Sequence, residues 1–188
     1  RTLALFMLAQ GVIVGTIDVA AVAFATQQGR PAMASVVLSF YALGSCAMGL
    51  LFGTLRLQMP LSRQIVWVGA SVAISALPLL LASNLTALTL AVLLAGITFG
   101  PTITVAMSLV EQQVQANRLT EGMTWLLTGL ASGVALGAAA AGWLIDHWGA
   151  QQSFVLTLLA GGAMWLWGVQ AGRQADRASA PGMTAINM

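Results

Sequence analysis

The sequence predicts an all-α membrane protein with six transmembrane helices. Hydrophobic residues make up 59% of the chain and charged residues only 6%. Soluble domains carry about 25% charged residues, so this chain has too few charges for a water-facing surface. The apolar residues also fall into six long stretches, at 2–26, 32–55, 65–82, 85–110, 122–145 and 153–171. About 20 helical residues cross the roughly 30 Å hydrocarbon core of a bilayer, and each stretch reaches or nearly reaches that length.

Helices fit these stretches better than barrel strands do. Backbone groups inside a bilayer must be satisfied within a helix or a closed barrel. Barrel strands alternate polar and apolar residues over about ten positions, whereas these stretches are apolar on all sides. Because the breaks are short, neighbouring helices are expected to be antiparallel. We therefore predict one transmembrane domain over residues 1–172, followed by a disordered cytoplasmic tail over residues 173–188, which is polar and rich in small residues.

The arginines predict the orientation in the membrane. Six of the seven lie at alternate breaks or at the chain ends, and only Arg30 falls on the other side. The six are Arg1, Arg56, Arg63, Arg118, Arg173 and Arg177. Cytoplasmic loops carry an excess of basic residues, so both termini are expected in the cytoplasm of a multi-pass protein of the plasma or bacterial inner membrane. The net charge of +2 is spread over helix ends, which argues against a nucleic-acid partner.

The first stretch contains Asp18, the only acid inside any of the six stretches. A charge near the membrane centre costs about 2.5–3.5 kcal/mol on insertion scales, so it is expected to face a partner or a water-filled cavity. Gly11 and Gly15 share its helix face, which would let a helix or a ligand approach closely. One interpretation is proton coupling, or recognition of a cationic or hydroxylated substrate. The other is a structural acid held by hydrogen bonds from neighbouring helices.

Small residues at four-residue spacing predict close helix packing in the second and fifth stretches. The second carries Ser45, Gly49 and Gly53, and the fifth carries Gly129, Gly133 and Gly137. In the fourth stretch, Gly96 and Gly100 precede Pro101. Proline lacks a backbone donor, so we expect a kink there.

Uncharged polar residues inside the stretches are candidates for a substrate and proton pathway together with Asp18. They are Gln10, Tyr41, Ser45, Thr98, Thr102 and Thr128. A cavity with few polar and many apolar groups suits a small, moderately apolar ligand. The alternative is that each Ser or Thr bonds to the backbone of its own helix.

Charged residues at the predicted cytoplasmic ends form a second candidate group. They are Arg56, Arg63, Glu111, Arg118 and Glu121. As a network they would latch one conformational state. Isolated exposed ion pairs are worth only about 0–1 kcal/mol, so a solvated charged rim is the alternative interpretation.

These features together resemble the C-terminal half of a major facilitator superfamily transporter. The motifs are the acid segment Ile17-Asp18-Val19-Ala20, the loop Gly53-Thr54-Leu55-Arg56 followed by Arg63, the Gly100-Pro101 pair, and the Gly-rich fifth stretch that ends in Gly142-Trp143-Leu144-Ile145-Asp146. The acid segment is similar to a motif of multidrug–proton antiporters. The segment Leu119-Thr120-Glu121-Gly122 resembles efflux-type members. At Leu57 the family loop motif has an acid, and this sequence departs from it.

The resemblance implies a fold, an activity and partners. The fold would be two inverted three-helix repeats, forming half of a 12-helix protein. The first, second, fourth and fifth helices would line a central cavity. The activity would be secondary transport of a small organic solute, with proton-coupled efflux favoured. The partners would be that solute, the proton, the lipid bilayer and an N-terminal six-helix half of the same polypeptide. We expect no cofactor and no metal.

Two other classes were compared with transport. A membrane scaffold or homodimer fits the six stretches if the gene product begins near Arg1. Intramembrane proteases with six helices need a serine and a histidine inside the membrane. The only histidine here, His147, lies in a predicted outer loop, so we expect no enzyme activity. No G-x-x-x-x-G-K-[ST] run occurs, which leaves an ion or substrate gradient as the expected energy source.

Overall fold

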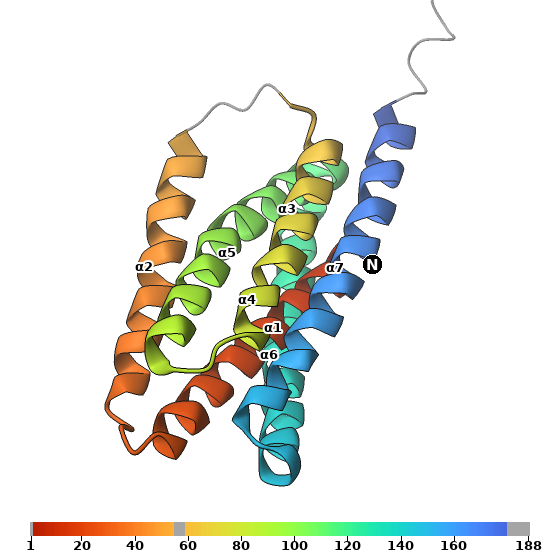
Figure 1. The fold of residues 1–188 in the computed structure, drawn as a ribbon. Helices are drawn as coiled ribbons and strands as arrows, with labels where there is room; N and C mark the ends of the chain where they lie inside the picture. Colours follow the sequence, from red (N-terminus) through yellow and green to blue (C-terminus); the bar gives the residue numbers. More distant parts are fainter. Residues whose placement is uncertain (1, 55–58, 180–188) are drawn as a thin grey trace, which may run out of the picture.

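The computed structural model describes residues 2–54 and 59–179, and all regular structure over them is helical. The elements are α1 (Thr2–Gln27), α2 (Met33–Thr54), α3 (Leu61–Ser75), α4 (Leu77–Leu80), α5 (Leu85–Gln113), the 3₁₀ turn η1 (Ala116–Arg118), α6 (Leu119–Trp148) and α7 (Ala150–Ser179). Helices α3 and α4 form a single span, which gives six helices long and apolar enough to cross a membrane among the described residues. Successive spans run in opposite directions (Figure 1). The predicted fold class is confirmed.

The turn between α1 and α2 is encoded by local sequence. Gly29 has φ +70°, a left-handed conformation that glycine adopts without strain. Its N–H donates to the Thr26 carbonyl at 3.0 Å, and the Arg30 N–H donates to the Ala25 carbonyl at 2.9 Å. This pair of bonds is a Schellman motif, and Pro31 follows it directly. The motif ends α1 sharply and reverses the chain within a few residues.

The third span is interrupted near its C-terminal end. Helix α3 ends at Ser75, and the four-residue α4 begins with Leu77 and Pro78. Proline has no N–H to continue the hydrogen-bond ladder, so the chain restarts its helix at that point. The span begins at Leu61, four residues before the predicted start at 65. Hydropathy detects only the part in hydrocarbon, whereas backbone hydrogen bonds continue into the polar segment around Arg63.

The C-terminal end of α7 lies within the segment predicted to be a cytoplasmic tail. Helix α7 continues to Ser179, seven residues beyond the expected end of the transmembrane domain at 172. The added segment, 173–179, contains alanine, arginine and glutamine, which have high helix propensity, so polarity alone did not end the helix. Residues 180–188 lie outside the described part of the chain. At the start of this segment, Thr2 Oγ1 donates to Gln174 Oε1 at 3.2 Å and links α1 to α7.

The packing of the six spans repeats under exchange of the two halves. Helix α1 packs most extensively against α6, and α2 packs most extensively against α5. Likewise α1 packs against α7, as α5 does against α3, and α3 meets α7 across the middle. If α1, α2 and the α3–α4 span are exchanged with α5, α6 and α7 in that order, each of these helix contacts becomes a contact that is also present. This is the arrangement of two inverted three-helix repeats.

Burial is uneven among the helices. Helix α1 has buried residues along its whole length, from Phe6 to Ala25. Helix α2 buries only Ala34, Val37 and Gly44, and exposes large apolar side chains such as Leu50. Helix α6 is similar: it buries four residues, Leu126, Gly133, Gly137 and Ala141. The outward faces of α2 and α6 are therefore apolar and uncovered within the described structure.

Candidate functional site

Asp18 lies on a different face of α1 from Phe6. Phe6 is fully buried, and its ring reaches the glycines of the outer helices, Gly69 of α3 and Gly168 of α7. Val14, Asp18 and Val22 follow each other at four-residue spacing on another face, where Asp18 is half-buried and Val22 exposed. At about 1.5 Å per residue, Asp18 is about 5 Å from the middle of α1. The carboxylate therefore faces away from the outer helices and lies inside the predicted span.

The α1 glycines next to Asp18 contact α6. A Cβ on Gly11 would overlap the Leu130 carbonyl oxygen, and a Cβ on Gly15 would overlap the Val134 carbonyl oxygen. On the other side of this seam, Gly129, Gly133 and Gly137 meet the backbone of α1 in the same way. The structure thus brings all five predicted packing glycines of α1 and α6 into one interface. The neighbour that approaches Gly11 and Gly15 is a helix.

The α2–α5 seam holds two of the predicted pathway residues. Gly96 lies against the Tyr41 carbonyl and Gly100 against the Ser45 carbonyl. Gly49 and Gly100 also meet, with a Cβ built on Gly49 at 3.6 Å from the Gly100 Cα.

The Tyr41 side chain also packs against an aromatic ring of α5. The Tyr41 ring packs at 5.8 Å from the Phe99 ring, centroid to centroid. Helices α1 and α2, which carry Asp18 and Tyr41, also contact each other. Both side chains are partly exposed, so both border the surface of the six-helix bundle.

The predicted pathway threonines differ in their surroundings. Thr98 donates to the Ala95 carbonyl at 2.8 Å, and Thr102 donates to the Thr98 carbonyl at 2.6 Å. Thr102 is fully buried, whereas Thr128 is exposed on α6. Backbone bonding of this kind is the alternative that the sequence left open for serine and threonine. It commits the hydroxyl protons of Thr98 and Thr102 to their own helix.

Gln10 also lies inside the bundle. Its side chain is only 2% exposed, and its Oε1 has no hydrogen-bond partner among the described residues. It follows Phe6 by one turn on the buried side of α1. An unpaired buried amide oxygen costs about 1–3 kcal/mol. Gln10 is therefore separated from the surface on which Asp18 lies.

The structure also gives the surroundings of two further residues from the predicted packing set, Gly53 and Pro101. A Cβ added to Gly53 would meet nothing within 4 Å, so this glycine has no packing partner in the described chain. Pro101 is buried inside α5, which remains one continuous helix from Leu85 to Gln113. Because Pro101 has no N–H, the Ile97 carbonyl one turn earlier loses its usual donor.

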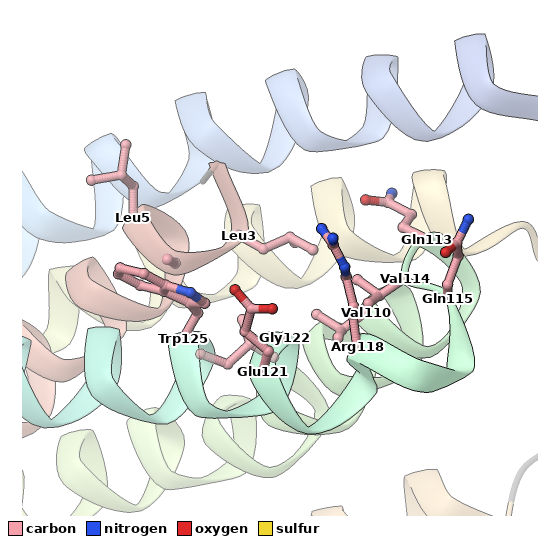
Figure 2. A pocket seen from close by; sticks show the side chains of 12 residues that line it. Leu3, Leu5, Val110, Gln113, Val114, Gln115, Arg118, Glu121, Gly122 and Trp125 are labelled. Atoms are coloured by element: carbon pink, nitrogen blue, oxygen red, sulfur yellow. The ribbon is translucent and has the colours of Figure 1, made fainter.

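The predicted charge network is divided by the structure. Arg118 and Glu121 line one pocket at the ends of α1, α5 and α6 (Figure 2). Arg63 and Glu111 are exposed and do not line it, and Arg56 lies outside the described residues. The pocket has a volume of about 1150 Å³. Its lining residues are Leu3, Ala4, Leu5, Val110, Gln113, Val114, Gln115, Arg118, Glu121, Gly122, Trp125 and Leu126.

Most of this pocket was missed by sequence reasoning. Gln113 and Gln115 stand in a glutamine-rich break between two stretches, which is an unusual composition for such a short connection. That signal was available. The approach of Leu3 and Leu5 to the same break was not, because it depends on the α1–α6 packing. Among the described residues, no group of three His, Cys, Asp or Glu side chains is placed to hold a metal ion.

Comparison with known proteins gives one family match. A family model described as Major Facilitator Superfamily matches residues 2–183, which includes all six spans and both glycine seams. A comparison with curated proteins finds no match.

Proposed function

Because the chain belongs to the Major Facilitator Superfamily, a family of membrane transporters, we propose that it supplies one half of a proton-coupled exporter of small organic solutes. In this fold the substrate lies near the midplane, between two six-helix halves. Helices α1, α2, α5 and α6 would line that cavity. Helices α3, α4 and α7 would face lipid.

Asp18 is the observation that carries the proton-coupling proposal. It is the only charged residue of α1, it is half-buried, and it faces away from the outer helices. A carboxylate in such a place is costly unless it binds a proton, a cation or water. Tyr41, on the contacting helix α2, would provide a hydroxyl that can exchange a hydrogen bond with either protonation state. Asp18 would load a proton from one side and release it when the cavity opens to the other.

The outward faces of α2 and α6 support a second half as partner. Leu43 and Leu50 on α2 are 61% and 69% exposed, and Leu136 on α6 is 58% exposed. These helices carry fewer buried residues than α1, although their sequences are as apolar as spans require. A second six-helix unit would cover these faces and enclose the Asp18 region. A homodimer or membrane scaffold, the alternative function, would use the same faces without transport.

Inverted membrane vesicles from cells that express the full-length protein test this proposal. The vesicle interior is acidified, and a pH-sensitive dye reports proton release while single solutes from a panel of small organic compounds are added. We expect at least one solute to accumulate and to release protons from the lumen. Accumulation that depends on a sodium gradient and not on the proton gradient would overturn the proposal that the proton is the coupling ion. If no solute moves faster than in vesicles lacking the protein, the scaffold is favoured.

A further inference from the structure

The pocket at the ends of α1, α5 and α6 has an apolar wall and a charged rim. Leu3, Val110 and Leu126 belong to the wall, and Arg118 and Glu121 belong to the rim. At about 1150 Å³, its volume is slightly above the usual range for small-molecule sites, which is about 300–1,000 Å³. It lies at the end of the bundle predicted to be cytoplasmic. The pocket is separated from Asp18 by several turns of α1.

The two rim charges have opposite sign and a common direction. Arg118 and Glu121 are three residues apart at the start of α6, and both side chains are exposed. Figure 2 shows Arg118 of η1 and Glu121 of α6 both extending toward α1, with the guanidinium and the carboxylate apart from each other. An anion alone would meet the repulsion of Glu121, and a cation alone would meet that of Arg118. A ligand that carries both charges would satisfy both side chains.

The wall adds a requirement for an apolar body. In Figure 2, Trp125 lies beside Glu121 and Leu3 extends toward Arg118, and the Trp125 side chain is 61% exposed. Tryptophan at this depth is typical of the membrane interface, where one part of a ligand is wet and the other apolar. A chain or ring attached to the charged groups would cover the wall and the indole. Gln113 adds neutral donors and acceptors at the same rim.

We propose that this pocket binds a zwitterionic amphiphile, with its anionic group on Arg118, its ammonium on Glu121 and its apolar body on the wall around Leu3 and Leu126. If the proposed function holds, on which this further step rests, the pocket is where an exported solute first binds from the cytoplasm. The same chemistry occurs in free amino-acid-like solutes and in the phosphoethanolamine headgroup of a lipid. The experiment below distinguishes these two sources.

Matched eight-carbon probes test the charge requirement. Purified full-length protein in nanodiscs of uncharged-headgroup lipid is titrated calorimetrically with 2-aminooctanoic acid, octanoic acid and octylamine at pH 7. Empty nanodiscs supply the correction for partitioning into the bilayer. We expect saturable binding of 2-aminooctanoic acid at least tenfold tighter than either singly charged probe. Equal affinity for all three probes, or no saturable binding of the zwitterion, would overturn the proposal.

Variants locate the site. Arg118→Gln is expected to weaken the binding of 2-aminooctanoic acid about tenfold, down to the affinity of octylamine. Glu121→Gln is expected to weaken the binding of 2-aminooctanoic acid to the affinity of octanoic acid. Arg173→Gln and Glu111→Gln are the controls, because both residues are exposed at the same end and neither lines the pocket. Equal losses in the control variants would show a general charge effect and would overturn the assignment.

Lipid composition separates the sources. The 2-aminooctanoic acid titration is repeated in nanodiscs that contain phosphatidylethanolamine and in nanodiscs that contain phosphatidylglycerol. If only phosphatidylethanolamine competes with 2-aminooctanoic acid, the pocket binds the proposed charged groups, but on a lipid, and the role in solute loading is overturned. Absence of competition supports a free solute. Because binding is measured without transport, failed transport with intact zwitterion binding counts against the proposed function alone. Transport that persists without any zwitterion binding counts against this inference alone.

Discussion

Gly11 of α1 and Gly133 of α6 meet backbone to backbone: a Cβ built on either would lie 2.9 Å from the Cα of the other. Real Cβ atoms do not approach other carbons so closely, so both positions require glycine while the helices keep this separation. The seam runs from Gly129 to Gly137 and supports the face of α1 next to Asp18. Close backbone packing therefore fixes the helix that carries the candidate proton site.

Substitution in this seam is expected to destabilise the protein. Gly133→Ala forces α1 and α6 apart, and overpacking of this kind costs about 1–3 kcal/mol. For a domain of this size, each kcal/mol lowers the unfolding temperature by about 2–4 °C. Gly142→Ala is the control, because Gly142 lies in the same helix and a Cβ there would meet nothing within 4 Å. Thermal unfolding in detergent should separate the two variants; equal midpoints would contradict the packing.

A similar comparison tests the α2–α5 seam. Gly100 meets the Ser45 carbonyl and the Gly49 backbone, whereas Gly53 has nothing within 4 Å. Gly100→Ala is expected to cost about 1–3 kcal/mol. Gly53→Ala is expected to be neutral or slightly stabilising, since alanine is favoured over glycine within helices by about 1 kcal/mol. A destabilised Gly53→Ala variant would restore the packing role predicted for this glycine from sequence.

The start of α5 depends on a side-chain cap. Asn84 Oδ1 accepts a hydrogen bond from the Ala87 N–H at 2.8 Å, which satisfies one of the free donors of the first turn. Asn84→Ala is expected to lower the free energy of unfolding by about 1 kcal/mol. Ser83→Ala is the matched control, since Ser83 precedes the capping position. Denaturation of both variants in the same detergent measures the difference.

Cysteine labelling tests the orientation of the spans. In a Cys46→Ser background, Ser83→Cys is expected to react with a membrane-impermeant maleimide on intact cells. Arg63→Cys is expected to react only after permeabilisation, because basic loops remain in the cytoplasm. Both positions are exposed, and Ser83 is used so that the cap at Asn84 stays intact. The opposite labelling pattern would invert the topology and move both termini outside.

Asp18 is tested by changing its charge with little change of shape. Asp18→Asn is expected to lower proton-driven accumulation at least tenfold in vesicles while the exchange of solute persists. Asp18→Glu should retain part of the coupling, and Asp146→Asn, at an exposed position outside the seams, should retain all of it. If Asp18 is purely structural, the Asp18→Asn variant would instead have a lower yield and a lower unfolding temperature, with its proton coupling unchanged. Full coupling in a stable Asp18→Asn variant would remove this residue from the proton pathway.

The sequence by itself determined the six spans, because about 20 consecutive apolar residues have one stable arrangement in a bilayer. It also identified Asp18, whose charge is unusual in its surroundings, and the glycine spacing that permits close packing. Local signals were sufficient for the Gly29 turn and the Asn84 cap. The turn and the cap depend only on neighbours within about a turn of the chain.

Only the tertiary structure decided which surfaces these residues share. Gly133 and Gly142 look alike in the sequence, but one meets α1 and the other meets nothing within 4 Å. Gln10 and Asp18 are both polar residues of α1, but the packing of the helices buries Gln10 fully and Asp18 only in part. The pocket around Arg118 forms where α1 crosses the break between α5 and α6. Such contacts join residues more than a hundred positions apart, and their geometry depends on how whole helices pack.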